Sequence, residues 1–301
     1  MTFTFECPQC GNLCAFDEKH VGRRARCLHC HERFTIPAPG TKAKAVPRIP
    51  ERPLGGFFHE ALLRTPRAVF RTASATGTVF LTALVVFRFF LSHVNYSLEL
   101  PGFTLYFPLG LLAVVITCGL QAWYYMEIIG ATYLECDILT ESDLGSGFEF
   151  AWAIIKSAYL FICAFLTAIL PLTILACLLR EVGVWQPWVL YPLPWLGVLF
   201  LPTTLLIIST GQEFYQVFRP DNLVLPLIKA PLPYLTVVIL TLGAGVLELA
   251  TMNFGGLLEA PIRTQCLHLL GNLAAMYLGV TAMRAIGLFG RHYECRLPWL
   301  K

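Results

Sequence analysis

The stretch from Trp152 to Leu178, WAIIKSAYLFICAFLTAILPLTILACL, decides the fold of this chain. It runs for 27 residues and contains one charged side chain, Lys156. An α-helix needs about 20 apolar residues to cross roughly 30 Å of hydrocarbon. The stretch therefore predicts a membrane-spanning helix, and Pro171 predicts a kink within it.

Comparable apolar stretches occur on both sides of this one. Hydrophobic residues make up 56% of the chain and charged residues 14%, whereas soluble domains carry about 25% charged residues. We expect an all-α polytopic membrane helix bundle of about six spans, preceded by a small N-terminal β domain. The expected spans are residues 73–92, 105–129, 152–178, 188–209, 232–252 and 267–286.

Positive charge is concentrated before the first expected span. Residues 1–71 contain 12 Lys and Arg against six Asp and Glu, whereas the rest of the chain contains 10 against 13. Lys and Arg close to membrane-spanning segments favour the cytoplasmic side. The first residues also carry no secretory signal pattern. We expect a multi-pass protein of the cell inner membrane, with both termini in the cytoplasm.

Two cysteine pairs near the start of the chain have the spacing of a zinc site. Cys7 and Cys10 are separated by two residues, as are Cys27 and Cys30, and 16 residues lie between the pairs. Each short gap allows a tight turn to point two thiolates at one ion, and two such turns complete a tetrahedral shell of four sulfur atoms. Gly11 suits the positive φ of such a turn. Because four thiolates fill the shell, we expect a structural Zn²⁺.

Other interpretations of these residues stay open. A redox CxxC at Cys7 and Cys10 would expect a βαβ setting and leaves the second pair unexplained. Cys14, His29 and His31 could each replace a ligand, although we interpret them as bystanders. About 35 residues bury too little to fold alone, so the metal would supply the folding free energy of the N-terminal domain.

Three segments of the N-terminus, FECPQCG (5–11), GRRARCLHC (22–30) and FTIP (34–37), resemble the zinc-ribbon, finger-like domain at the N-terminus of many bacterial proteins. The resemblance covers the first 37 residues. It implies that the four cysteines of the two pairs bind zinc, namely Cys7, Cys10, Cys27 and Cys30. Cys14 lies outside the pattern. The remaining chain, with its ending RAIGLFGRHY (284–293), is similar to bacterial multi-span membrane proteins of unassigned function that carry such a domain.

A basic segment joins this domain to the membrane region. Residues 1–37 form the expected zinc ribbon, residues 38–56 form a linker rich in Pro and basic residues, and residues 57–301 form the membrane domain. The stretch from Phe57 to Phe70 mixes apolar residues with arginines. It fits either a helix lying in the lipid headgroup region or an ordinary basic flank of the first span.

Polar residues inside the expected spans are candidate functional groups, because charges in a membrane are costly. Glu248 in the fifth span is the main candidate, with Asn272 and His268 in the sixth span and Arg88 in the first as partners. The alternative is that Glu248 and Arg88 lie near span ends and extend to the interface. His268 alone is more typical of a hydrogen-bonded packing residue.

These features favour a membrane-anchored binding or scaffolding protein, in which a zinc-ribbon head recruits a cytoplasmic protein partner. The alternative is a small-molecule or ion transporter with a regulatory zinc ribbon. We expect no enzyme, because the sequence contains no recognisable catalytic motif. Contacts with the lipid bilayer are expected, and nucleic acid binding is not, because no aromatic stacking set or groove-binding helix accompanies the basic residues.

Overall fold

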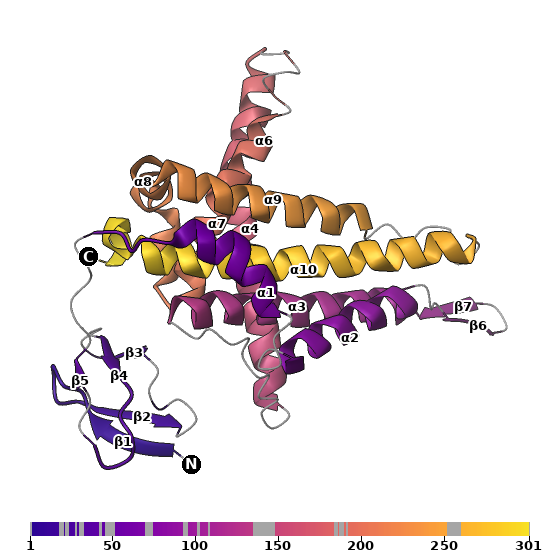
Figure 1. Ribbon diagram of the computed structural model, residues 1–301. Helices are drawn as coiled ribbons and strands as arrows, with labels where there is room; N and C mark the ends of the chain where they lie inside the picture. Colours follow the sequence, from indigo (N-terminus) through magenta and orange to yellow (C-terminus); the bar gives the residue numbers. More distant parts are fainter. Residues whose placement is uncertain are drawn as a thin grey trace.

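The computed structural model describes residues 2–17, 21, 24–27, 29, 33–41, 44–45, 52–69, 75–92, 96–100, 103–107, 109–134, 148–183, 186, 190, 192–251 and 260–300. Predictions for Cys30 and His31 lie outside these described residues. The described chain is mostly helical, with a small β head at its N-terminus (Figure 1).

The strands of the head are β1 (Thr2–Glu6), β2 (Leu13–Asp17), β3 (Arg24–Arg26), β4 (Arg33–Thr35) and β5 (Lys44–Ala45). A hairpin of β6 (Tyr96–Leu100) and β7 (Phe103–Phe107) separates two of the helices. The longer helices are α2 (Ala75–Leu91), α3 (Leu109–Tyr133), α4 (Phe148–Glu181), α9 (Pro231–Thr251) and α10 (Ile262–His292). The shorter helical elements are η2 (His59–Arg64), α1 (Thr65–Val69), α6 (Pro192–Gly197), η4 (Val198–Phe200), α7 (Leu201–Ser209), η5 (Phe214–Phe218), α8 (Pro220–Lys229), η7 (Glu294–Arg296) and η8 (Pro298–Leu300).

The head has a small core of its own. Strand β1 pairs antiparallel with β2, and β4 pairs antiparallel with both β3 and β5. Phe34 is fully buried, and its ring contacts the rings of Phe5 and Phe16 edge-on, with centroids 5.2 and 6.0 Å away. The sheet extends to Ala45, beyond the expected end of the ribbon at residue 37. The first part of the expected linker therefore belongs to the head.

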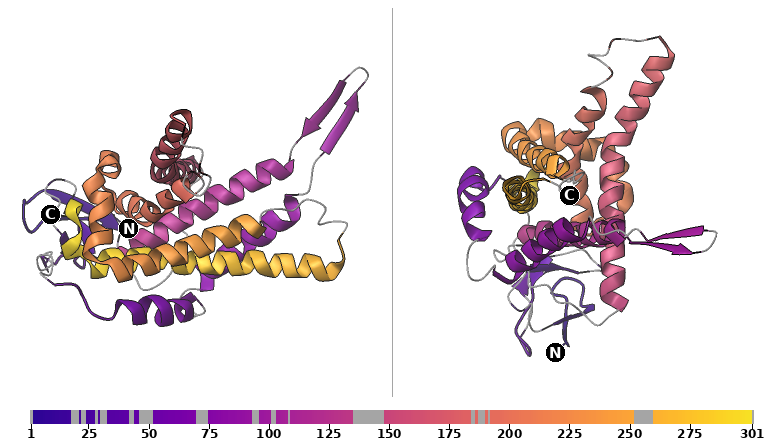
Figure 2. Two further views of the ribbon diagram at one scale, coloured as in Figure 1. Left: turned by 90° about the horizontal axis from the view of Figure 1, so that it is seen from above. Right: turned by 90° about the vertical axis from the view of Figure 1, so that its right-hand side faces the viewer.

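Helices α3, α9 and α10 run alongside one another, whereas α4 and α6 run across their direction (Figures 1 and 2). Figure 2 shows α9 and α10 nearly end-on in its right-hand view, where α4 stands upright beside them. Helix α4 meets α3 close to Gly119, whose ideal Cβ position would lie 3.5 Å from Ile154 and 3.8 Å from Ala158. Only 11% of the apolar window of α4 is buried, so most of its apolar surface is available to lipid.

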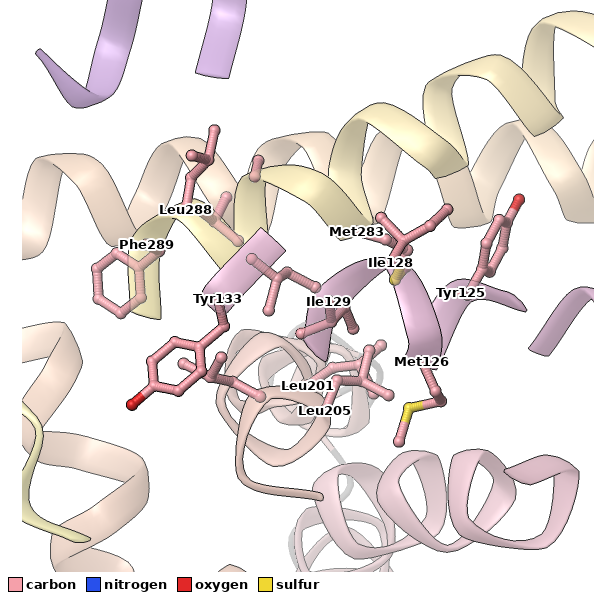
Figure 3. Close-up of a cluster of buried hydrophobic side chains, with 14 of the residues drawn as sticks. Tyr125, Met126, Ile128, Ile129, Tyr133, Leu201, Leu205, Met283, Leu288 and Phe289 are labelled. Carbon is pink, nitrogen blue, oxygen red and sulfur yellow. The ribbon is translucent and has the colours of Figure 1, made fainter. Parts of the chain in front are cut away.

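The main core lies where α3, α7 and α10 meet (Figure 3). Three residues from these helices are buried, each with at most 1% of its surface exposed: Ile129 of α3, Leu205 of α7 and Ile286 of α10. Residues 201–208, which make up nearly all of α7, are buried, as expected for a helix that is apolar on every side and enclosed by others. This core fixes the relative positions of the helices that carry the polar residues described below.

Four described helices are long and apolar enough to cross a membrane: Leu109–Tyr133, Ile154–Glu181, Pro231–Thr251 and Ile262–His292. The expected count of six is not reached among the described residues, because two further apolar helices, Ala75–Leu91 and Trp195–Ser209, are shorter. Within the expected span 188–209, α6, η4 and α7 follow one another directly over the described residues 192–209, and η4 is a 3₁₀ turn between two α-helical segments. Pro171, by contrast, lies inside the uninterrupted helix α4.

The basic stretch before the first expected span packs lengthwise against α10. The backbone N–H of Leu54 donates to the carbonyl of His292 at 2.9 Å. Further along, the Tyr277 hydroxyl donates to the carbonyl of Pro66 at 2.9 Å. These two hydrogen bonds connect Leu54, which precedes η2, and Pro66 of α1 to positions 15 residues apart on α10, so the segment follows this helix and does not lie alone in a headgroup layer.

A glycine allows α10 to approach α3 closely, which gives a first prediction. A Cβ at Gly287 would lie 2.7 Å from both the Ile129 carbonyl oxygen and the Thr132 Cβ. We expect Gly287→Ala to destabilise the protein by about 1–3 kcal/mol, as overpacking does. Gly245→Ala is the control, because no heavy atom lies within 4 Å of that Cβ position. Thermal unfolding in detergent measures both variants, and equal unfolding temperatures would contradict the close contact.

Candidate functional site

The first candidate site is a group of three thiols in the head, Cys7, Cys10 and Cys27, which we call the thiol cluster. Their sulfur atoms all lie within 4.8 Å of one another. The turn after β1 places the first pair, because the Cys7 N–H donates to the Asn12 carbonyl at 2.8 Å and the Gly11 N–H donates to the Cys7 carbonyl at 3.0 Å. Gly11 has the left-handed conformation that the sequence predicts, with φ of 73°.

The spacing of these sulfur atoms suits a metal ion. An ion about 2.3 Å from each of four tetrahedral sulfur ligands separates neighbouring sulfurs by about 3.8 Å. The sulfurs of Cys10 and Cys27 are 3.7 Å apart, which also excludes a disulfide between them. Cys7 and Cys27 are buried, in contact with the aromatic core of the head. The thiol cluster could therefore hold a metal ion.

Cys14 is closer to the thiol cluster than the sequence pattern indicates. Its position opposite Phe5 in the β1–β2 pairing brings its sulfur within 4.0 Å of Cys27. Burial, followed by the hydrogen bond to Cys27 and the charges of the other thiols, raises the pKa of Cys14 to about 11. A cation among these sulfurs would act in the opposite direction, because it stabilises a thiolate. His29 lies exposed on a turn.

The second candidate site lies between the helices, and we call it the polar network: Arg88, Gln121, Tyr125, Glu248, His268 and Asn272. Its centre is an ion pair between Arg88 of α2 and Glu248 of α9, with 2.8 Å between Nη1 and Oε1. The Arg88 side chain is 1% exposed and the Glu248 side chain 20%. Arg88 therefore does not extend to the interface as the alternative interpretation expects.

Hydrogen bonds connect this ion pair to α3 and α10. Arg88 donates from Nη1 to Gln121 Oε1 at 3.1 Å and from Nη2 to Asn272 Oδ1 at 3.4 Å. The Gln121 amide donates to the Tyr125 hydroxyl at 2.8 Å and to Glu248 Oε2 at 3.3 Å. The network thus joins side chains from four helices, which is the arrangement expected when charges must be paired in an apolar bundle.

Asn272 is the link between the ion pair and His268. Its side chain is fully buried, and its Nδ2 lies 3.2 Å from the His268 Nδ1 and 2.9 Å from the His268 carbonyl oxygen. The same amide donates to the Thr251 carbonyl at 3.3 Å, at the last residue of α9. His268 therefore reaches the ion pair through Asn272, within the described part of the chain.

The structure brings together the polar residues that the sequence singles out and adds two more. Arg88, Glu248, His268 and Asn272 meet in one network, whereas Gln121 and Tyr125 were not predicted as members. The Tyr125 ring has room in the network because it lies against a glycine of α10. An ideal Cβ at Gly279 would lie 2.8 Å from the Tyr125 Cζ. The sequence did contain a signal for Gln121, because a polar amide in the middle of an apolar helix indicates a buried polar contact.

Comparison with protein families, with curated proteins and with solved structures finds no match to this chain. Its class therefore follows from the described residues alone. It is a mostly helical protein with four apolar helices of membrane-spanning length, which indicate a membrane protein. Its small N-terminal β region contains a cluster of cysteines able to hold a metal ion.

Proposed function

We propose that this protein is a membrane-anchored scaffold, in which a zinc-stabilised head recruits a cytoplasmic protein partner. The observation that carries the proposal is the thiol cluster inside a head with its own aromatic core. In the proposed site Cys7, Cys10 and Cys27 supply three ligands, and Cys30 supplies the fourth. An ion enclosed by four thiolates has no open coordination position for a substrate, which favours a structural metal and a binding role.

The proposed orientation has the head and the C-terminus in the cytoplasm of a cell with an inner membrane. The excess of Lys and Arg before the first helix supports it. The C-terminal end of α10 also carries Arg291 and is followed by Arg296 and Lys301. The backbone hydrogen bond between Leu54 and His292 brings the start of the membrane domain beside this end of α10. This agrees with the head and the C-terminus lying on the same side of the membrane.

An exposed apolar residue beside the thiol cluster offers a contact for a partner. Leu13 is 74% exposed at the start of β2, directly after the turn that carries Cys7 and Cys10. We propose it as the contact for the partner, because apolar surface removed from water favours association. Because Leu13 lies outside the head core, it can be changed without loss of the fold.

The test is covalent crosslinking in intact membranes followed by identification of the captured proteins. We expect a defined cytoplasmic protein that is captured by the full chain and lost on deletion of residues 1–45. We expect Leu13→Ser to reduce its capture at least about tenfold while the metal content stays the same. Leu63→Ser is a control outside the head, because Leu63 is also exposed. An unchanged capture by the deletion variant would contradict the proposal.

The alternative function, a transporter regulated by the head, stays a prediction. The ion pair of Arg88 and Glu248 supports the presence of a binding group between the helices. A binding group is one requirement of transport. The kind of ligand that this ion pair would bind can be inferred independently of the recruiting role of the head.

A further inference from the structure

The guanidinium of Arg88 has hydrogen-bonding capacity that the protein leaves unused. Its Nη1 contacts Glu248, Gln121 and, at 3.7 Å, the sulfur of Cys118. Its Nη2 has a single long contact, with Asn272 at 3.4 Å. Its Nε is buried and has no hydrogen-bond partner among the described residues. A buried donor without a partner has lost its hydrogen bonds to water without replacement, so such an atom in a charged side chain calls for an explanation.

The unpartnered Nε and the weakly bonded Nη2 form one edge of the guanidinium, and this edge can recognise anions. Nε and Nη2 point their N–H bonds in the same direction, and this pair of parallel donors matches the two oxygens of a carboxylate. In the structure Glu248 takes the other terminal nitrogen, with one oxygen 2.8 Å from Nη1. The ion pair is therefore monodentate at Arg88. Among the described residues, the Nε–Nη2 edge is engaged only by the long contact from Nη2 to Asn272, which a second oxyanion would replace.

Charge balance decides which kind of ligand can enter. Arg88 keeps its proton at all physiological pH values, so the pair with Glu248 is neutral as a unit. A metal cation added at Glu248 would leave the site with a net positive charge in apolar surroundings, where an uncompensated charge is costly. An anion that arrives together with one proton leaves the site neutral, because the proton neutralises Glu248 while the anion pairs with Arg88.

We propose that Arg88, Glu248, Gln121 and Asn272 form a binding site for a small carboxylate, which binds together with one proton. On binding, a proton from solvent bonds to an oxygen of Glu248 and the ion pair with Arg88 opens. The carboxylate of the ligand then accepts hydrogen bonds from Nε and Nη2 of Arg88. The freed oxygens of the Gln121 and Asn272 side chains accept from hydroxyl groups on the ligand or from the protonated Glu248.

The two charged residues lie near the ends of their helices. Glu248 lies three residues before the end of α9, and Arg88 lies three residues before the end of α2. Glu248 is the partly exposed member of the pair, at 20%. A proton can therefore meet Glu248 first, and its neutralisation releases Arg88 for the incoming carboxylate.

Other titratable groups face this site from the neighbouring helices. They are Cys118 and Tyr125 on α3 and His268 on α10. His268 is linked to the ion pair by hydrogen bonds through Asn272, and Tyr125 by hydrogen bonds through Gln121. Glu248 is the group in direct contact with Arg88 whose protonation would release the guanidinium. The variant His268→Gln is the control that shows whether the proton taken up on binding goes to Glu248 or to His268.

The test uses the purified full chain in detergent and titrates acetate, lactate and succinate by calorimetry, with chloride at equal ionic strength as the control anion. Titration in two buffers of different ionisation enthalpy counts the protons bound. We expect at least one carboxylate to bind with uptake of one proton, and its affinity to rise about tenfold for each unit by which the pH falls. Chloride should produce no comparable heat.

Variants separate the roles of the two charged residues. Glu248→Gln should bind the same carboxylate without proton uptake and with little dependence on pH, whereas His268→Gln should behave like the unchanged chain. Arg88→Gln should weaken binding by about 30-fold or more. The unchanged chain alone decides the matter if a variant fails to fold. The absence of binding for all three carboxylates, or binding without proton uptake, would overturn the proposal, and neither result bears on partner recruitment by the head.

Discussion

Replacing Cys7 or Cys27 with serine is expected to unfold the head and leave the helical region intact. The head buries few large apolar side chains, chiefly Phe5 and Phe34, and a domain of this size rarely folds without metal or disulfides. Binding of structural zinc contributes about 10–16 kcal/mol in zinc-finger peptides, far more than this core can replace. The loss of one ligand should therefore remove the folded state of the head.

Limited proteolysis measures this effect directly. Cleavage sites within residues 2–45 should become accessible in the Cys7 and Cys27 variants, and equally in the unchanged chain after treatment with a zinc chelator. Cys177→Ser is the matched control, because Cys177 lies exposed on α4. Circular dichroism should report the same helix content for all variants. A head that resists protease after Cys7→Ser would show that the thiols do not hold it together.

Separating the charges of the polar network should produce the second large effect. Arg88→Met leaves Glu248 without its cationic partner, and a broken buried ion pair typically costs about 3–5 kcal/mol. The double variant with Glu248→Met should recover most of this loss, because a matched apolar pair requires no desolvated charge. Unfolding in detergent, followed by circular dichroism, measures the free energy of unfolding of the unchanged chain, the two single variants and the double variant, which completes the double-mutant cycle.

An exposed ion pair of the same chain is the control for this cycle. Arg219 and Asp221 are 2.9 Å apart, almost the same distance as Arg88 and Glu248, but their side chains are 55% and 40% exposed. Exposed pairs contribute about 0–1 kcal/mol, so Arg219→Met should have little effect. If Arg88→Met costs no more than Arg219→Met, the polar network does not hold the four helices together.

The polar network illustrates what could be predicted from the sequence. Glu248, Asn272 and His268 stand out because each is a polar side chain in an apolar window, and Arg88 was their predicted partner. Their convergence depends on helix packing that no local pattern records. Gln121 was missed although it is equally polar, and Tyr125 was not predicted as a member. Its actual position requires the absence of a side chain at Gly279.

The helical region was predicted in outline and not in its details. Composition identifies the apolar helices, because hydropathy over about 20 residues requires no tertiary information. The expected span 105–129 begins four residues before α3, because strand β7 takes up residues 103–107. The expected span 188–209 is longer than the apolar helix Trp195–Ser209. The crossing of α4 over α3 was not predicted, since it depends on side-chain packing between distant segments.

In the head, the spacing of the cysteines predicts the thiol cluster, but the surrounding sheet was underestimated. Strand β5 comes from a segment whose Pro and Lys content favours a linker, and it pairs antiparallel with β4. The proximity of Cys14 to Cys27 follows from the pairing of β1 with β2. Strand register is set by pairing between strands, so the sequence could not distinguish Cys14 as a neighbour of the thiol cluster from Cys14 as a bystander.

The most direct test of the account is metal analysis of the purified, reduced chain by mass spectrometry. We predict one zinc per chain, lost in Cys7→Ser and in Cys27→Ser and retained in Cys177→Ser. Cys14→Ser and Cys30→Ser, measured in parallel, identify the fourth ligand as the residue whose replacement releases the ion. A reduced chain that contains far less than one zinc would contradict the account.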